Sequence, residues 1–303
     1  MIDIGICSYK SAERLKRVID SIHKTTVEDF RILIWHNQSP GDYECIKTVQ
    51  DQTKQHVISE NLGYAGAVNG LIAMSTSDRF VYCDNDIEIR TRWDQKFSEV
   101  LDKFPKVAQV FPGAGHYGFH NGEYRECLWN AGYFWMLRHD EPFRRKLSDS
   151  DHWHRRIHQT FDKTYPFDSQ IGHHEEVDFM IRLRLAGFRI ACCPDVDVWH
   201  EANSTAENPD NHKPGGRIHD GVVRWMNKWN RYFCGEELEY AMDRYDPRAL
   251  RYTDWPPCAL YLERWTLAQF PMNRDPRVVQ TSAGPMDAIE ILKPTECYRG
   301  RAI

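Results

Sequence analysis

Short apolar runs and amphipathic segments alternate along much of the chain. Apolar runs of strand length lie at 2–7, 30–35, 56–59 and 107–111. Helical patterns lie between them at 12–22, 43–54 and 93–104, and another runs through Ala73. In the first of these helices Leu15, Val18 and Ile19 share one face. Strand and helix in regular succession favour an α/β fold with a parallel sheet.

A further apolar run, Phe80–Ile89, is interrupted by two carboxylates. Asp84 and Asp86 are separated by Asn85, where the strand is expected to end. Oxygen ligands in this spacing suit Mg²⁺ or Mn²⁺ if the chain turns so that both face one cation. A short acidic triplet without further context is more typical of a solvated turn.

The position of this triplet in the expected sheet changes that interpretation. Ligands of open parallel sheets bind at the carboxyl ends of strands. The loops after the first, second and fourth expected strands are polar or glycine-rich, and the segment Asn61–Gly70 lets backbone approach a ligand closely. Taken alone, its glycines also fit a tight turn and close helix packing. We expect these loops to converge on one cleft.

A second acidic cluster begins a helical pattern near residue 175. Val177, Met180 and Leu185 recur at helical spacing, and Gly187 is a suitable C-terminal stop. Acidic residues favour the first turn of a helix. Three carboxylates within four residues, following two histidines, exceed what capping requires.

Composition narrows the classes of protein. The 303 residues are 41% hydrophobic and 27% charged, with a net charge of -5, as in a globular protein whose main ligand is not the nucleic-acid backbone. A nucleic-acid acceptor is thus not indicated. Nine cysteines, several in apolar runs, are expected to be reduced thiols. No signal peptide or spanning helix is recognised, so a soluble, cytoplasmic protein without a membrane span is expected.

Four segments together carry a resemblance to a known family. They are Ile4–Tyr9, Ile32–Ser39, Glu60–Asn69 and Val81–Asp86. Their succession resembles family 2 glycosyltransferases of the GT-A fold, a three-layer α/β sandwich with a mostly parallel, Rossmann-like central sheet. The resemblance implies a nucleotide-sugar donor and a DXD motif, in which Mn²⁺ or Mg²⁺ bridges the donor diphosphate to Asp86 and less directly to Asp84.

The resemblance also implies roles for individual residues. Glu176 is the expected general base of an inverting transfer, with Glu175 and Asp178 as alternatives. His200 is the expected third metal ligand beside Asp84 and Asp86. The residues expected on the donor side are Ser8, Tyr9, His36, Asn37, Asn61, Gly63, Asn69, Asp84 and Asn85.

The family pattern is expected to cover residues 1–240, with a nucleotide-sugar half (1–110) and an acceptor half (111–240). The polar segment 201–216 fits a linker or an active-site lid, and its place directly after His200 favours a lid. Residues 217–233 have an amphipathic helical pattern, and 241–303 form a helical or irregular C-terminal extension. The histidines of 151–158 are interpreted as a solvated surface, because a metal site needs further ligands.

Three rival functions fit parts of the same pattern. A retaining GT-A glycosyltransferase shares the fold and metal site but does not need Glu176 as a base. A sugar-phosphate nucleotidyltransferase also uses paired carboxylates on a metal, and a non-catalytic protein could bind nucleotide sugars or carbohydrates with the same fold. A UDP-sugar is the favoured donor, although His36 stands where the family usually has an acidic residue. The acceptor is not specified by the sequence.

Overall fold

The fold is built on one central sheet of nine strands, ordered β3-β2-β1-β4-β9-β6-β10-β8-β7. The computed structural model describes residues 1–9, 11–37, 55–113, 119–120, 124–126, 132–149, 167–168, 171, 175–185, 188–201, 220, 278–281 and 284–287. The strands of this sheet are β1 Ile2–Ser8, β2 Phe30–Asn37, β3 Gln55–Ser59, β4 Arg79–Asp84, β6 Val107–Pro112, β7 Phe119–His120, β8 Arg125–Glu126, β9 Phe134–Arg138 and β10 Arg189–Cys193.

The N-terminal half of the sheet is parallel, as the strand and helix succession predicts. β1 lies between β2 and β4 and is parallel to both, and β2 is parallel to β3. β9 is antiparallel to its neighbours β4 and β6, while β10 is parallel to β6. The carboxyl ends of β1, β2 and β4 therefore meet at one edge, where the sequence placed its polar loops.

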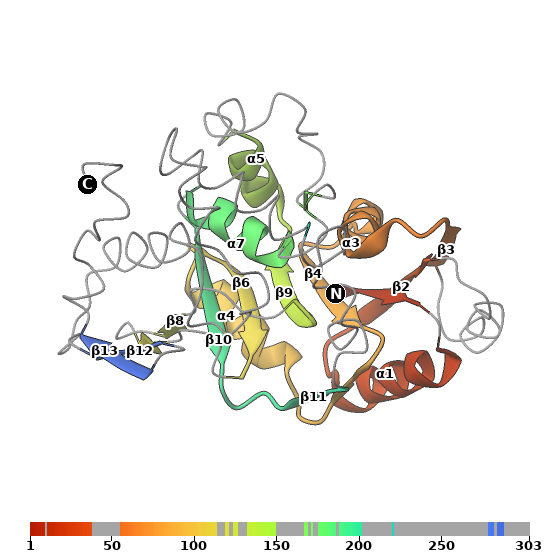
Figure 1. The fold of residues 1–303 in the computed structure, drawn as a ribbon, viewed down its shortest axis with the longest axis horizontal. Coiled ribbons are helices and arrows are strands. Elements are labelled where there is room, and N and C mark those ends of the chain that lie inside the picture. The colour runs from red at the N-terminus through yellow and green to blue at the C-terminus, as the bar shows by residue number, and fades with distance from the viewer. Residues whose placement is uncertain are drawn as a thin grey trace.

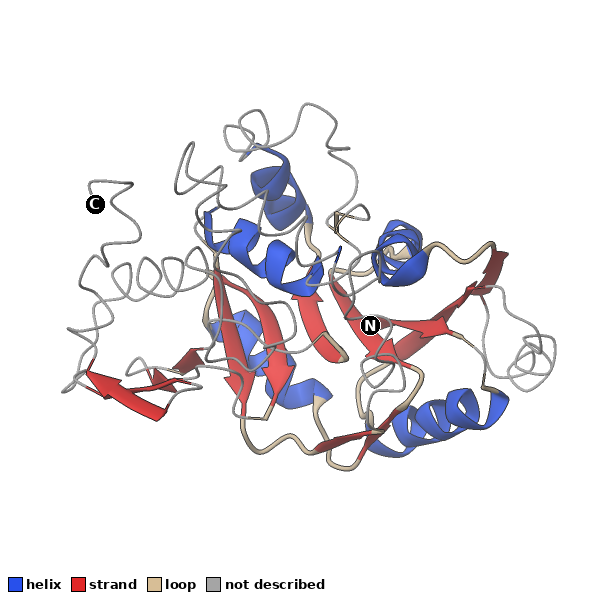
Figure 2. Ribbon diagram, in the orientation of Figure 1, coloured by secondary structure: helices blue, strands red, loops and turns tan. Residues whose placement is uncertain are grey.

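Helices cover both faces of the sheet and make three layers (Figures 1 and 2). α1 (Ala12–Thr25) and α4 (Asp94–Lys103) share one buried cluster, and α3 (Gly63–Met74), α5 (Glu141–Asp149) and α7 (Glu175–Leu185) contribute to the other. β4 supplies both clusters alternately, since Phe80 and Tyr82 face one and Val81 and Cys83 the other. Alternating side chains of a strand point to opposite faces. The α/β three-layer prediction is confirmed.

The apolar run Phe80–Ile89 forms two strands, and the first of them ends at the acidic triplet, as the sequence predicts. β4 ends at Asp84, the chain turns at Asn85 and Asp86, and β5 (Ile87–Ile89) leaves the central sheet. β5 pairs instead with β11 (Val198–His200) in a separate antiparallel ribbon, with Ile87 opposite His200. This ribbon lies beside α1 in Figure 1. The turn and the ribbon bring the end of β11 next to the acidic triplet.

Several expectations fall outside the described residues. These are the helix at 43–54, the histidines of 151–158, residues 202–216 of the expected lid and, except for the helical Asp220, the helix at 217–233. In the expected C-terminal extension, the described residues form two antiparallel strands, β12 (Val278–Thr281) and β13 (Gly284–Asp287). Among the described residues, no helix has both the length and the apolar composition to span a membrane.

Candidate active site

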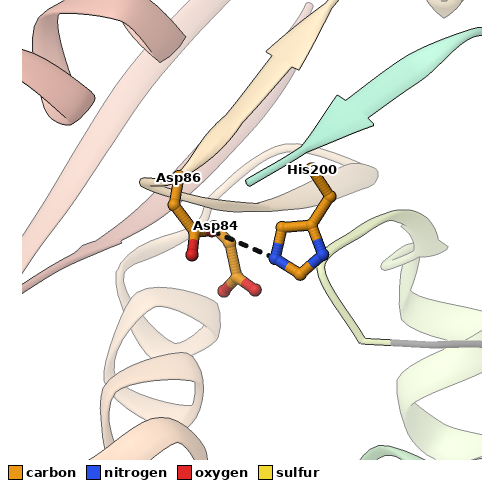
Figure 3. Close-up of side chains that lie close together, drawn as sticks. All are labelled: Asp84, Asp86 and His200. Carbon is orange, nitrogen blue, oxygen red and sulfur yellow. Dashed lines mark ion pairs between the residues drawn. The ribbon is translucent and has the colours of Figure 1, made fainter. Parts of the chain in front are cut away.

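Asp84, Asp86 and His200 lie together at the carboxyl end of β4 (Figure 3). One ligand atom of each lies within 4.8 Å of the others, and Nε2 of His200 is 3.2 Å from Oδ1 of Asp86. All three side chains are partly exposed. The backbone fixes this arrangement, because Glu201 N–H donates to the Asp86 carbonyl at 3.0 Å directly beside the β5–β11 ribbon. The three residues that the sequence proposed as metal ligands are thus adjacent.

The electrostatics of this group suit a cation. Burial and the neighbouring charge of Asp86 raise the pKa of Asp84 to about 7, despite a 2.5 Å hydrogen bond from the Tyr82 hydroxyl. The contact with Asp86 raises the pKa of His200, whose ring stacks on Tyr133 at 4.8 Å between centroids. A divalent cation would relieve the repulsion between the two carboxylates. Two carboxylates and an imidazole form a donor set that fits Mn²⁺.

The second acidic cluster occupies the first turn of α7. Glu176 is partly exposed, whereas Glu175 and Asp178 are buried. Asp178 lies 2.9 Å from Nε of Arg182, one turn later on the same helix, and both side chains are at most 2% exposed. The structure therefore gives Asp178 a buried ion pair rather than an exposed position.

Glu176 is electrostatically linked to the group formed by Asp84, Asp86 and His200. Burial, the charge of Glu175 and that of Asp84 raise its pKa to about 8. The charge of Asp84 contributes to this shift, although less than that of Glu175. A carboxylate with a pKa near neutrality is suited to accept a proton.

Tyr64 and Gly132 connect the two clusters physically. The Tyr64 ring packs edge-on against Tyr82 at 5.2 Å, and its hydroxyl donates to the Gly132 carbonyl at 3.1 Å. A Cβ atom at Gly132 would lie 2.8 Å from the Tyr64 hydroxyl and 3.1 Å from Cβ of Glu176. Gly132 thus allows the chain before β9 to approach both side chains.

The residues expected on the donor side at the ends of β1 and β4 have different environments. Ser8 is fully buried, and within the described part of the chain its hydroxyl has no hydrogen-bond partner. Tyr9 is exposed, and its carbonyl accepts a 3.1 Å bond from the Asn85 amide. Asn85 therefore joins the loop after β1 to the acidic turn. His36, opposite Ser8 in the sheet, is fully buried.

Three of the expected donor-side residues shape the glycine loop. Asn37 donates to the Gly63 carbonyl at 3.0 Å and accepts from Leu62 N–H at 3.2 Å. Asn61 accepts from Gly63 N–H at 2.9 Å. Gly63 has φ +70°, a left-handed conformation that favours glycine. These contacts fix where α3 begins.

Asn69 has a role that the sequence did not suggest. Its amide makes two bonds to the backbone of Phe167, donating to the carbonyl at 2.8 Å and accepting from N–H at 2.9 Å. Its side chain is buried, and these two bonds hold the segment before α7. Contact of Asn69 with the donor stays a prediction.

Comparisons with known proteins agree with this architecture. The family model described as Glycosyl transferase family 2 matches residues 3–166, which is more than half of the chain. The chain belongs to glycosyltransferase family 2. No match was found among curated proteins.

Solved structures similar to this family 2 glycosyltransferase include S. aureus TarS. TarS 1-349 superposes with a TM-score of 0.53 at 12% identity, covering 89% of this chain and 81% of that one. The same TarS fragment in complex with UDP-GlcNAc gives 0.52 at 12% identity, with the same coverage. A longer TarS structure gives 0.52 at 13% identity, and the match covers 90% of this chain and 50% of that chain. At this identity the likeness concerns the fold, and it confirms the GT-A prediction.

The sequence did not single out the residues that connect the two acidic clusters. Tyr64 lies in the glycine-rich segment Asn61–Gly70 and Tyr82 in the apolar run Phe80–Ile89, but the sequence pattern predicts no site role for either. Their roles depend on contacts between β4, α3 and α7, which no local pattern reveals.

Proposed function

We propose that this glycosyltransferase moves a sugar from a nucleotide-sugar donor to an acceptor hydroxyl, with inversion and with a divalent cation. The observation that carries the proposal is the 3.2 Å contact of His200 with Asp86, beside Asp84 and in electrostatic reach of Glu176. Together, the contact and the proximity in charge of Glu176 support a cation site and a base at the same edge of the sheet.

The donor side of the proposal rests on the three grouped side chains. Asp84, Asp86 and His200 would hold Mn²⁺ or Mg²⁺, which supplies positive charge to the diphosphate leaving group. The fold neighbour TarS has been crystallised with UDP-GlcNAc and with UDP, which supports a uridine nucleotide as donor here. Asn85 holds the loop after β1 through the Tyr9 carbonyl, and Tyr9 is exposed beside the acidic turn.

On the acceptor side, the proposed general base is Glu176. Its carboxylate takes the proton of the acceptor hydroxyl while that oxygen forms a bond to the anomeric carbon. The bond from this carbon to the diphosphate oxygen breaks on the opposite face, so the configuration inverts. The buried Glu175 is placed to raise the pKa of Glu176 rather than to contact an acceptor.

Release of nucleoside diphosphate from a panel of nucleotide sugars tests the proposal. We expect release that needs Mn²⁺ or Mg²⁺ and is abolished in Asp86→Ala, while Asp102→Asn, which changes an exposed carboxylate on α4, has normal activity. Pyrophosphate release from a nucleoside triphosphate and a sugar phosphate would instead show a nucleotidyltransferase. Thermal stabilisation by nucleotide sugars without turnover would show a binding protein.

The stereochemistry of the product separates inverting from retaining transfer. With an α-linked donor, proton NMR of the first product formed should show a β linkage. An α-linked product would overturn the role of Glu176 as base and leave the cation site in place.

A further inference from the structure

The ribbon that presents His200 is short. β5 and β11 have three residues each and pair only with one another in the part of the chain that the structure describes. An isolated two-stranded ribbon is marginally stable in water. The position of His200 therefore needs support from outside the ribbon.

Helix α1 supplies that support through the residues on either side of His200. Glu201 accepts bonds from Nη2 of Arg14 at 2.6 Å and from Nη2 of Arg17 at 2.5 Å. Trp199 packs against the guanidinium groups of Arg17 and Arg90, 5.0 and 5.7 Å from its ring centroid. Alternate residues of a strand point to opposite sides. Trp199 and Glu201 thus contact α1, while His200 faces the two aspartates.

We propose that Glu201 is a positioning residue: by bridging Arg14 and Arg17 it fixes β11 against α1 and pre-orients the His200 imidazole for the cation. This inference rests on the proposed cation site. The three side chains of the bridge are between 31% and 36% exposed, so the bridge contributes little to global stability. Its consequence is local, at the ligand next to Glu201.

Mn²⁺ affinity of the full chain tests the inference without an activity assay. Free Mn²⁺ is measured by electron paramagnetic resonance in a titration of wild type, Asp86→Ala and the double variant Arg14→Gln/Arg17→Gln. The double variant is informative because loss of charge and loss of positioning change Mn²⁺ affinity in opposite directions. Loss of two positive charges near a cation would by itself tighten binding. Loss of a positioning contact weakens it, and we expect a decrease in affinity of about 10-fold, as for other supports of metal ligands.

Two further variants complete the design. Asp20→Asn breaks the exposed ion pair between Lys16 and Asp20 on the same helix and should leave Mn²⁺ affinity unchanged. Glu201→Asp, which keeps the charge but shortens the reach, should weaken binding, since one carboxylate must span two arginines. If the double variant does not fold, the single variants Arg14→Gln and Arg17→Gln should weaken binding in the same direction.

The outcomes separate the two claims. Equal or tighter Mn²⁺ binding by the arginine variants, with binding lost in Asp86→Ala, overturns the positioning role and keeps the cation site. No binding by wild type, or full affinity in Asp86→Ala, overturns the cation site and this inference with it.

Discussion

At the scale of single residues, the proposed chemistry depends on the carboxyl group of Glu176. Burial and the charge of Glu175 raise its pKa, and a Gln at this position keeps the shape but cannot take a proton. We expect Glu176→Gln to lower kcat by about 10²- to 10⁴-fold, the usual contribution of a general base. Binding of UDP with Mn²⁺, measured by calorimetry, should be unchanged.

Glu175→Gln is the matched control for that substitution. It removes a neighbouring charge but not the base, so kcat should fall much less. A larger loss in Glu175→Gln than in Glu176→Gln would assign the base to Glu175.

The raised pKa of Glu176 also predicts a pH dependence. Because the base acts as a carboxylate, kcat/KM should rise with pH, with a midpoint well above 4.5, the ordinary pKa of Glu, and no higher than about 8. A bound cation neutralises part of the charge of Asp84 and shifts the midpoint downward. Initial rates between pH 5 and 9 at saturating metal measure this midpoint. The rise should be absent in Glu176→Gln, and a flat profile in wild type would contradict the assignment.

At the scale of elements, the close approach of α3, α7 and the start of β9 depends on Gly132. A methyl group there would meet the Tyr64 hydroxyl at 2.8 Å and Glu176 at 3.1 Å. We expect Gly132→Ala to displace these side chains and to reduce kcat more than the affinity for UDP. Gly132→Ala/Tyr64→Phe, which removes the nearest atom, should recover part of kcat. No recovery would indicate that the contact with Glu176 alone causes the loss.

The position of β1 within the sheet depends on the buried Asp3. Its carboxylate accepts bonds from Arg31 on β2 and from Ser75, Thr76 and Ser77 between α3 and β4. Burial opposes its ionisation, but these bonds, led by that of Arg31, outweigh burial and lower the pKa of Asp3. One side chain thus connects two strands and a helix end.

Replacing Asp3 should therefore destabilise the sheet. We expect Asp3→Ala to lower the free energy of unfolding by about 3 kcal/mol, because it leaves buried donors without their acceptor. Asp102→Ala removes a carboxylate with a similar two-oxygen contact to Arg79, but it is 65% exposed and should cost less than about 1 kcal/mol. Urea unfolding measures both.

The loss of stability caused by Asp3→Ala should depend on pH. A lowered pKa in the folded state stabilises the fold above the unfolded value of 3.8, and this contribution is lost as pH falls through the folded value. The difference between wild type and Asp3→Ala should shrink in that acidic range. A difference in the free energy of unfolding that does not change with pH would show that the charge of Asp3 does not contribute to stability.

At the scale of the whole molecule, local patterns predicted the order of elements because strand and helix periods are local properties. The runs at 2–7 and 30–35 became β1 and β2, and the pattern at 93–104 became α4. The end of β4 at the acidic triplet was predicted, but the separate strand β5 was not, since its pairing with β11 joins residues more than 100 positions apart. The contact of Asn69 with Phe167 likewise joins residues far apart in the sequence.

Binding of a cation should stabilise the whole molecule. A ligand that binds only the folded state raises its stability, by about 2.7 kcal/mol at 100 times its dissociation constant. Mn²⁺ should therefore raise the midpoint of thermal unfolding, and Asp86→Ala should remove this shift. An equal shift in Asp86→Ala would mean that Mn²⁺ binds elsewhere.

The pairing of β5 with β11 also has a consequence for how the protein is made. During synthesis, Asp84 and Asp86 leave the ribosome well before His200, and the arginines of α1 precede Glu201 by 184 residues or more. A growing chain thus has the two carboxylates of the proposed cation site with no imidazole beside them. The complete proposed site forms only after β11 has docked on α1, so a bound cation would indicate that both segments of the enzyme have been assembled.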